Sequence, residues 1–269
     1  MVYLFLTQMH TEGCSYNQIA MSRSALSTII DKGIKPYPSF GQHPFVKRFL
    51  KGIFEMKPVL PKYPFVWDVS KLLEYFRKGD DPCASSFSVL GKKLAILLTI
   101  LSGGQRAQTI FSIDVLDIKI VGGNCVIPIY DTLKQTRPGH HLEPLKFSVY
   151  LKEPKLCVIT ILKEYLKKTT GLRTHSKLFI SSQKPHQPVS KDTISRWCKQ
   201  TMEYAGIDTT LFTSHSSRSA ATSMLFQKGA SISLICKSAG WSNEKVFRRH
   251  YQKKIIENDE NDVMSHLLN

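Results

Sequence analysis

Acidic residues are few in this chain: 21 Asp and Glu stand against 37 Lys and Arg, which gives a net charge of +16 over 269 residues. A protein with such an excess of positive charge usually binds a polyanion, and nucleic acid is the first candidate. A solvated basic surface without a partner is the alternative. The hydrophobic content of 42% is ordinary for a globular protein and argues against general disorder.

Long apolar runs are missing. The most apolar stretch, Leu94 to Leu101, has about eight residues, far below the roughly 20 that span a bilayer. It therefore predicts a buried helix. The apolar start, Val2 to Leu6, is short and lacks the basic leader and cleavage site of a secretory signal. We expect an intracellular protein with no membrane partner.

Cysteine pairs with metal-ligand spacing are also missing. The six cysteines are scattered, with no C-x-x-C among them. They are interpreted as reduced core thiols, which argues against a disulfide framework or a zinc site.

Common catalytic motifs are equally lacking. The sequence has no Walker loop, no H-E-x-x-H and no G-x-S-x-G. Asp114 and Asp117 lie close together, but nothing downstream completes a two-magnesium site. We therefore expect neither a metal nor a small-molecule cofactor.

The candidate chemistry lies in residues 213–251. His215 and Arg218 are three residues apart and share a face on a helix. Arg218 has the planar fork of donors that suits phosphate oxygens, Trp241 has an indole N–H, and Tyr251 has a phenol that can attack phosphorus. Taken singly, each has an ordinary role as a helix cap, surface charge, core indole or packed ring. Together they are equipped to handle a phosphodiester without a metal.

This set resembles the catalytic end of the tyrosine recombinases, also called the phage-integrase family. The family's mark is H-x-x-R, then Gly followed by His or Trp, then a Tyr about one helix further on. Here these are His215 to Arg218, Gly240-Trp241 and Tyr251. The order and spacing of the whole set carry the resemblance.

The distance from Trp241 to Tyr251 distinguishes this chain from many bacterial members. Those members place the Tyr nine residues after the His or Trp, a position that His250 occupies here, whereas Tyr251 is at ten. The ending F-x-x-H-Y resembles the recombinase-like genes of animal mobile elements. Tyr251 remains the expected nucleophile, because a histidine adduct with DNA would be labile.

The family also has an Arg far upstream and a Lys on a hairpin. Arg106 matches the first, in the first turn of a helix predicted over 105–112, where free N–H groups favour an anion. Thr109 stands where members often have an acidic residue, which weakens the support expected for Arg106. Lys134 matches the second, on the polar tip 131–141 of a predicted hairpin. Its nearby rivals are Lys119, Arg137 and Lys146.

Helix signals dominate the first 79 residues. Gly13 ends a helix predicted over 2–12, Ser15 caps a second to about residue 31, Pro44 opens a third to residue 56, and Asp68 caps a fourth over 69–78. The charged, helix-breaking stretch 79–82 marks the predicted domain boundary.

The remainder predicts helices around a small sheet. Helices are expected over 86–101, 154–168 and 190–205, and three more within 213–251, with Gly229 and Gly240 between them. Strands are expected over 116–121, 125–130, 142–149 and 177–181. The fold class is mainly α with a small antiparallel β-sheet (α+β).

The resemblance implies three segments: a helical core-binding-like DNA clamp over 1–79, a catalytic domain over 84–258, and a tail over 259–269. The apolar end of that tail could dock on a neighbouring subunit or fray.

The resemblance also implies a site-specific, metal-independent DNA strand transferase, which breaks and rejoins double-stranded DNA through a covalent 3′-phosphotyrosine. Arg106 and Arg218 would balance charge on the phosphate, with His215 and Trp241 as further donors. Tyr251 would attack phosphorus, and Lys134 would protonate the departing oxygen. Self-association on DNA, as a tetramer of the family type, and a nuclear location are expected.

Two other functions fit the same residues. A non-catalytic DNA-binding relic of a mobile-element recombinase would show the same charge and fold. A type IB topoisomerase-like enzyme shares most of the chemistry. Basic helix residues could face phosphates or lie on plain solvated faces in any of these cases: Arg23, Lys47, Arg48, Lys191, Arg196 and Lys199.

Overall fold

A computed structural model describes residues 2–34, 39–58, 64–134, 136, 139 and 141–256 of the chain. The chain divides into two units, residues 1–62 and 63–269. Arg137 and the tail 259–269 lie outside the described residues, so the expectations placed on them are not taken further.

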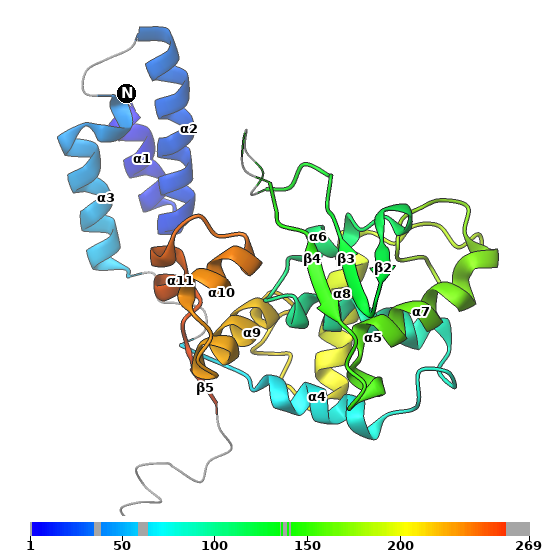
Figure 1. Cartoon of the computed structure of the whole chain (residues 1–269). Helices are drawn as coiled ribbons and strands as arrows, with labels where there is room; N and C mark the ends of the chain where they lie inside the picture. Colours follow the sequence, from blue (N-terminus) through cyan, green and yellow to red (C-terminus); the bar gives the residue numbers. More distant parts are fainter. Residues whose placement is uncertain are drawn as a thin grey trace, which may run out of the picture. The chain divides into compact units, whose positions relative to one another are not determined.

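The first unit contains three helices, drawn in blue in Figure 1: α1 (Val2–Thr11), α2 (Tyr16–Ile34) and α3 (Pro44–Met56). Each helix contributes one fully buried residue, Leu6, Ile19 and Val46, to a small apolar core. Pro44 opens α3 because its fixed φ suits a first helical turn, where its missing N–H needs no partner. The three helices expected here are confirmed.

Helix α4 (Val69–Lys78) belongs to the second unit, although it was expected in the first. Asp68 caps it as predicted, because its side chain accepts from the backbone N–H of Ser70 at 2.8 Å. Leu72 and Phe76 on its apolar face are buried in the main core of the second unit. The division between the units therefore comes before α4, upstream of the breaker-rich stretch 79–82.

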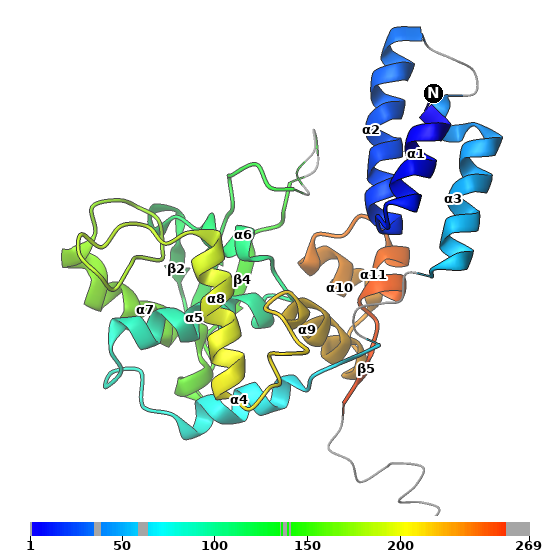
Figure 2. The ribbon, with the colours of Figure 1, turned by 180° about the vertical axis from the view of Figure 1, so that it is seen from behind.

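The centre of the second unit is α5 (Phe87–Leu101), which packs against α7 (Val158–Thr169) and α8 (Lys191–Tyr204). Residues 94 to 98 of α5 are all fully buried, because the helix is apolar on every side. Figure 2 shows α8 crossing α5 on the side that Figure 1 turns away. The prediction of a central buried helix over 86–101 is confirmed.

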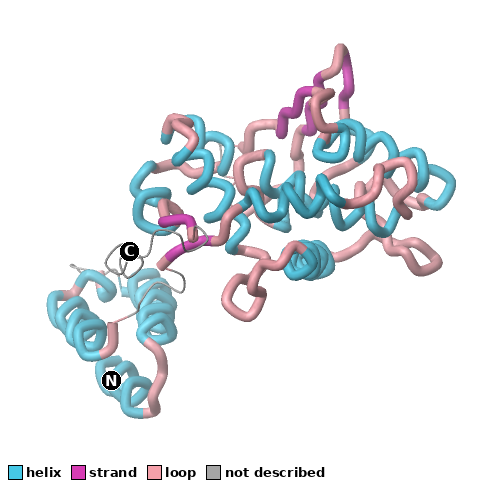
Figure 3. The backbone as a smooth tube through the Cα atoms, turned by 90° about the horizontal axis from the view of Figure 1, so that it is seen from below, coloured by secondary structure: helices cyan, strands magenta, loops and turns pink. Residues whose placement is uncertain are grey.

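A three-stranded antiparallel sheet stands beside these helices, in the order β2 (Lys119–Val121), β3 (Asn124–Ile127) and β4 (Leu145–Ser148). Figure 3 shows it in magenta at the edge of the helical unit. Val121 pairs with Asn124 across the tight turn formed by Gly122 and Gly123. The strands are shorter than predicted but lie in the expected places.

Two predicted elements are corrected. The segment 177–181 makes only isolated bridges, Asp114 with Lys177 and Ile180 with Pro188, because each partner is a single residue of a passing loop. The helix expected from Pro154 starts at Val158, after a 3₁₀ turn over Pro154–Leu156.

Three helices complete the second unit: α9 (Ser216–Gln227), α10 (Ile232–Ala239) and α11 (Glu244–His250). The chain then forms β5 (Lys254–Ile255), which pairs in parallel with β1 (Phe65–Val66). This two-residue pairing was not predicted, because segments so short carry no alternation of apolar and polar residues. It joins the two ends of the second unit.

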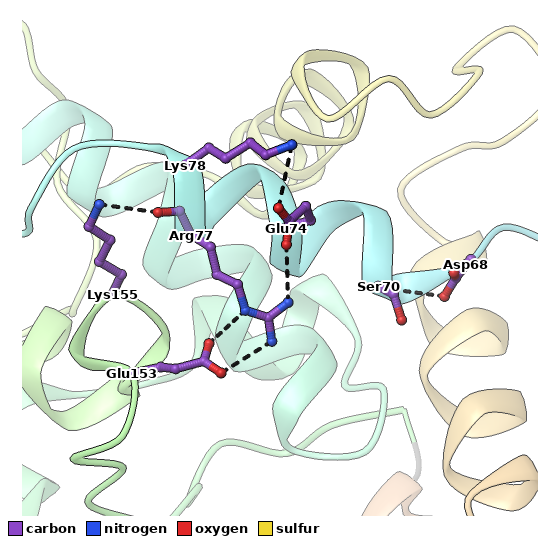
Figure 4. Close-up of polar contacts among 7 residues, drawn as sticks. All are labelled: Asp68, Ser70, Glu74, Arg77, Lys78, Glu153 and Lys155. Atoms are coloured by element: carbon purple, nitrogen blue, oxygen red, sulfur yellow. Dashed lines mark hydrogen bonds and ion pairs between the residues drawn. The ribbon is translucent and has the colours of Figure 1, made fainter.

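The end of α4 is bound to the loop before α7, as Figure 4 shows. Arg77 donates from Nε to Glu153 Oε2 at 2.7 Å and from Nη2 to Oε1 at 3.3 Å. Lys155 Nζ donates to the carbonyls of Gly79 at 2.6 Å and Arg77 at 3.1 Å. The bidentate Arg77–Glu153 ion pair and the Lys155 ammonium on the carbonyls at the end of α4 together fix this helix end.

All six cysteines are free thiols. Four are buried, as expected of core thiols, whereas Cys14 is partly exposed and Cys83 is exposed. Within the described part of the chain, no helix combines the length and apolarity needed to cross a bilayer. In the same residues, no cluster of three His, Cys, Asp or Glu side chains has metal-binding geometry.

Candidate active site

The site forms where three segments of the second unit meet: the turn after α5, the start of α9 and the stretch from α10 to α11. The turn carries Arg106, α9 carries His215 and Arg218, and the last stretch carries Trp241 and Tyr251. His215 is the N-cap residue of α9 and has helical backbone angles, and Arg218 lies in the first turn.

Arg218 is the largest fully buried side chain of the described residues, with 1% of its surface exposed. Its Nη1 donates to the carbonyl of Gly104 at 2.7 Å, and its Nη2 donates to the carbonyl of Ala239 at 2.6 Å. Burial lowers the pKa of Arg218, and the positive charge of Arg106 lowers it further. An arginine still keeps its proton at neutral pH, so a fixed cation lies at the centre of the site.

Two glycines allow the carbonyls to approach this guanidinium. Gly104 has φ +84, and a Cβ there would lie 3.0 Å from the Arg218 carbonyl oxygen and 3.2 Å from its Cγ. Gly240 ends α10 in the left-handed conformation, with φ 66, just after the accepting carbonyl of Ala239. Both positions need glycine, because an L side chain is strained there.

Aromatic rings cover the guanidinium. The Arg218 Cζ lies 4.6 Å from the ring centre of Trp241 and 5.5 Å from that of Tyr251. The nearby Tyr251 hydroxyl raises the pKa of Arg218, opposing the effect of burial. Phe247 is fully buried, 5.9 Å from the Trp241 ring. Phe247 therefore anchors α11 just before Tyr251.

Two buried N–H donors in this cluster have no hydrogen-bond partner: Nε of Arg218 and Nε1 of Trp241. A buried donor without a partner costs roughly 1–3 kcal/mol, so such atoms usually await a ligand, a water or an ion. Two donors beside one guanidinium suit an anion with several oxygens.

Three basic residues lie close enough to His215 to act on its imidazole. Its pKa lies below the ordinary value of 6.5, first because the ring is buried and then because Arg218, Arg106 and Lys134 place positive charge near it. The imidazole is therefore neutral at neutral pH and can accept a proton. Its ring centre lies 6.5 Å from that of Tyr251.

Arg106 precedes the short helix α6 (Ala107–Phe111) as its N-cap, with an extended backbone, and so is not in the first turn as predicted. The left-handed residues Gly103 and Gly104 delay the helix start. Arg106 lines a small cleft of about 70 Å³ together with His215, Arg218, Gln105 and other residues. Thr109, at the position where members often have an acid, is buried, and its hydroxyl has no partner.

Lys134 is exposed on the connection between β3 and β4, as expected for the hairpin tip. It is the hairpin lysine whose charge acts on His215. The rivals Lys119 and Lys146 lie exposed on β2 and β4 and are not among the charges that lower the His215 pKa. This contrast favours Lys134 for the site.

Sequence reasoning missed the supports of the site. Trp67 Nε1 donates to Ser216 Oγ at 2.9 Å beside His215. Ser223 Oγ donates to the Tyr251 carbonyl at 2.7 Å and accepts from the Lys253 N–H at 3.1 Å. Gln105 is 2% exposed and bonds the Ser238 carbonyl. No motif marks these residues, since their partners are 28 or more residues away.

The candidate DNA-binding residues divide by exposure. Lys47 and Arg48 are exposed on α3 of the first unit, whereas Arg23 on α2 is partly buried and its Nε has no partner. In the second unit, α8 carries three exposed basic residues, Lys191, Arg196 and Lys199. Ser195 of the same helix lines the cleft.

Comparison with known proteins identifies the fold. Among solved structures, the chain is similar to the integrase of the Tn1549 transposon in complex with circular intermediate DNA (14% identity, TM-score 0.60, 98% of this chain and 81% of that one). It is also similar to the XerH site-specific recombinase bound to its difH substrate (16% identity, TM-score 0.59, 93% of this chain and 65% of that one). A lambda integrase fragment bound as a dimer to a core site is a third (17%, TM-score 0.54, 97% and 82%). This chain thus spans less than two thirds of XerH.

Among curated proteins, none matches the chain. The profile of the phage integrase family matches residues 69–256, more than half of the 269 residues. The mainly helical fold with its small antiparallel sheet agrees with that match. The chain therefore belongs to the phage integrase family, the tyrosine recombinases, whose members are DNA strand-transferring enzymes.

Proposed function

We propose that this protein is itself an active site-specific recombinase, which breaks and rejoins double-stranded DNA through a 3′-phosphotyrosine at Tyr251. The observation that carries the proposal is the Arg218 cluster. A buried guanidinium, a stacked phenol and two partnerless N–H donors lie together in one unit. This arrangement provides a nucleophile beside a site for a phosphate.

Charge balance is the first task of the site. Attack on a phosphodiester adds negative charge to the free oxygens of a five-coordinate phosphorus. Arg218 and Arg106 would balance that charge as fixed cations, and Trp241 Nε1 would donate to one of the oxygens. Donors held in place before the reaction stabilise such a transition state without reorganisation.

Proton transfer is the second task. An ordinary phenol is protonated at neutral pH, so attack by the Tyr251 oxygen needs an acceptor for its proton. The neutral His215 imidazole suits this role. As the tyrosyl oxygen–phosphorus bond forms, the bond from phosphorus to the 5′ oxygen breaks, and Lys134 would protonate that departing oxygen. A 5′ hydroxyl of a second strand then reverses the step with a new partner.

The DNA duplex would contact both units. The first unit, residues 1–62 with exposed Lys47 and Arg48 and with Arg23, would supply most of the clamp that the resemblance implies over residues 1–79. Lys191, Arg196 and Lys199 on α8 would line the channel beside the cleft. The net charge of +16 supports contact with a polyanion. Because strand exchange needs several active sites, self-association on DNA as a tetramer is part of the proposal.

The source of the gene is a further part of the proposal. The spacing of ten residues between Trp241 and Tyr251 supports a recombinase of the kind carried by animal mobile elements. Such an enzyme would act in the nucleus.

One observation favours a second function, a DNA-binding protein without strand transfer. Both terminal nitrogens of Arg218 donate to backbone carbonyls, and Thr109 gives Arg106 no carboxylate. In a catalytic role these nitrogens would have to donate to the phosphate as well as to the two carbonyls. A site with a purely structural role needs only the carbonyl contacts.

A suicide-substrate assay separates the two functions. The protein is incubated with nicked duplexes from its own flanking DNA, without metal or ATP, and a covalent protein–DNA band is sought on a denaturing gel. Tyr251→Phe is the test variant, and His250→Ala is the matched control at the neighbouring position. We expect a band with the wild type and with His250→Ala, and none with Tyr251→Phe.

The other outcomes are equally informative. A band that survives in Tyr251→Phe would contradict the assignment of the nucleophile. Salt-sensitive DNA binding with no band from any protein would establish the non-catalytic function instead.

A further inference from the structure

A second cavity, of about 320 Å³, lies at the other end of the α5–α8 helix pair from the catalytic cleft. Thr99 of α5 and Cys198 of α8 line the cleft. The residues that line the cavity lie one to three turns away on the same two helices, among them Lys93 on α5 and Thr201 on α8. The end of α4 closes its third side. The reaction proposed above uses none of its residues.

Lys93 is the unusual member of this cavity. Only 6% of its surface is exposed, and its Nζ lies 5.0 Å from the ring centre of Phe76. Within the described residues it makes no ion pair and donates no hydrogen bond. Its side chain is largely buried, and its ammonium faces the cavity without an ion pair to any described residue. Asp81 and Asp80 are near enough to favour the charge, but burial outweighs them.

The walls around Lys93 are mainly aromatic and also carry neutral polar groups, with Asp80 and Lys92 in the lining. Tyr75 and Phe76 of α4 face the cavity with Tyr204 of α8. The hydroxyls of Ser85 and Thr201 donate to the Asp81 and Trp197 carbonyls, at 3.1 and 2.8 Å, so their oxygens remain free to accept. Aromatic walls with one buried charge are typical of a small-molecule site.

The cavity is held open by contacts outside it. The Arg77–Glu153 pair and the Lys155 bonds to the Arg77 and Gly79 carbonyls fix the end of α4 (Figure 4). Gly79 itself lines the cavity. A ligand would therefore meet a preformed wall, which lowers the entropy cost of binding.

We propose that this cavity binds a small aromatic monoanion, such as a carboxylate or sulfonate, with its charge on the Lys93 ammonium and its ring against the aromatic walls. Of the two lysines in the lining, only Lys93 is buried, and one buried cation calls for one negative charge. Asp80 lines the same cavity, and Asp81 also acts on Lys93, so a polyanion would be repelled. The inference does not depend on the proposed function.

The charges around Lys93 determine how binding depends on pH. Burial lowers the pKa of Lys93 to about 8; Lys155 lowers it too, whereas Asp81 and Asp80 raise it. Lys92, Tyr75 and Tyr204 also face the cavity. Because only the protonated amine attracts an anion, affinity should fall as the pH rises through this value.

The test is a fluorescence titration of the full chain with anilinonaphthalene sulfonate, an aromatic monoanion, followed by competition with benzoate. Lys93→Met removes the charge and keeps the volume, and Lys93→Arg keeps the charge. Val89→Trp fills the cavity mouth from a position that is 53% exposed. The matched controls are Lys92→Met, at the neighbouring lysine, and Val121→Trp, at an exposed position on β2.

We expect one saturable site that benzoate competes for. Lys93→Met should weaken binding about 10- to 100-fold, as loss of a charge-assisted contact does, and Val89→Trp should abolish it. Lys93→Arg and both controls should stay within about threefold of the wild type, a factor worth less than 1 kcal/mol.

Two results would overturn the proposal. One is the absence of saturable binding to the wild type. The other is binding that neither Lys93→Met nor Val89→Trp changes, because the probe would then lie elsewhere. If Lys93→Met does not fold by circular dichroism, Val89→Trp and the pH dependence decide the question.

Discussion

The phenol of Tyr251 lies against the indole of Trp241, with ring centres 4.3 Å apart and planes inclined by 33°. Both rings face the guanidinium of Arg218. The proposed nucleophile is therefore positioned by the same residue that would donate to the phosphate, so packing and chemistry can be separated by substitution at Trp241.

Trp241→Phe should keep the stack and lose the N–H. Loss of one donor to a developing oxyanion typically costs about 100- to 1000-fold in rate, and we expect a loss of this size in the rate of covalent complex formation. Trp241→His, which restores a ring N–H, is the control and should recover part of the rate. Equal rates in the wild type and Trp241→Phe would show that the indole only packs.

Arg218→Lys should destabilise the fold as well as abolish strand transfer. A lysine cannot donate simultaneously to the Gly104 and Ala239 carbonyls in the planar geometry seen here. Loss of these buried contacts should lower the free energy of unfolding by about 2–4 kcal/mol, measured by urea denaturation. Arg196→Lys on the exposed face of α8 should change it by less than about 0.5 kcal/mol.

Ser223→Ala tests the support behind the nucleophile. Its hydroxyl holds the Tyr251 carbonyl and the Lys253 N–H, so its removal should loosen the chain on either side of Gln252. We expect a several-fold slower covalent step with a stability loss of about 1 kcal/mol, measured by single-turnover trapping and thermal unfolding. Ser24→Ala, which removes an exposed hydroxyl from α2, should leave both unchanged.

His215 should make stability depend on pH in one direction. Its pKa in the folded chain lies below 6.5, mainly through burial, so the unfolded chain binds the proton more tightly. Its contribution is present above about pH 6.5 and is lost as the pH falls through the folded pKa. Urea unfolding of the wild type should show this loss on acidification, and in His215→Gln the pH profile should be flatter. Matching profiles would mean that the ring is not held neutral.

Lys93→Met should raise the free energy of unfolding of the ligand-free protein by about 1–2 kcal/mol, because an apolar side chain replaces a largely buried charge that makes no ion pair with the described residues. Differential scanning calorimetry would measure the gain. Lys92→Met, at the more exposed neighbour, should give no comparable gain. A less stable Lys93→Met protein would show that Phe76 and the nearby carboxylates already compensate the charge.

The sequence predicted most of this architecture because the signals were local. Pro44 and Gly240 mark a helix start and a helix end by their backbone conformation, and Asp68 marks a start by its side-chain cap. The apolar residues of α5 predict burial by themselves. The order of Arg106, His215, Arg218, Trp241 and Tyr251 indicated the family, and the structure brings these five residues into one unit.

The features that the sequence did not reveal depend on long-range contacts. The boundary before α4 is set by the partners of Leu72 and Phe76, which local breakers do not indicate. The start of α6 after Arg106, the bond of Trp67 to Ser216 and the buried Lys93 all result from tertiary packing. A lysine in an apolar helix can equally extend to solvent, so only its surroundings show that it is buried.

The pairing of β1 with β5 has a consequence for engineering. Val66 accepts a hydrogen bond from the Ile256 N–H at 2.8 Å, so the first and last described segments of the second unit lie side by side. Such a unit is suited to circular permutation. A short Gly-Ser linker between the strand ends, with a new opening at the exposed Gly122–Gly123 turn, would preserve every contact around Tyr251. The same closeness of the two ends suits residues 64–256 to insertion into a loop of another protein.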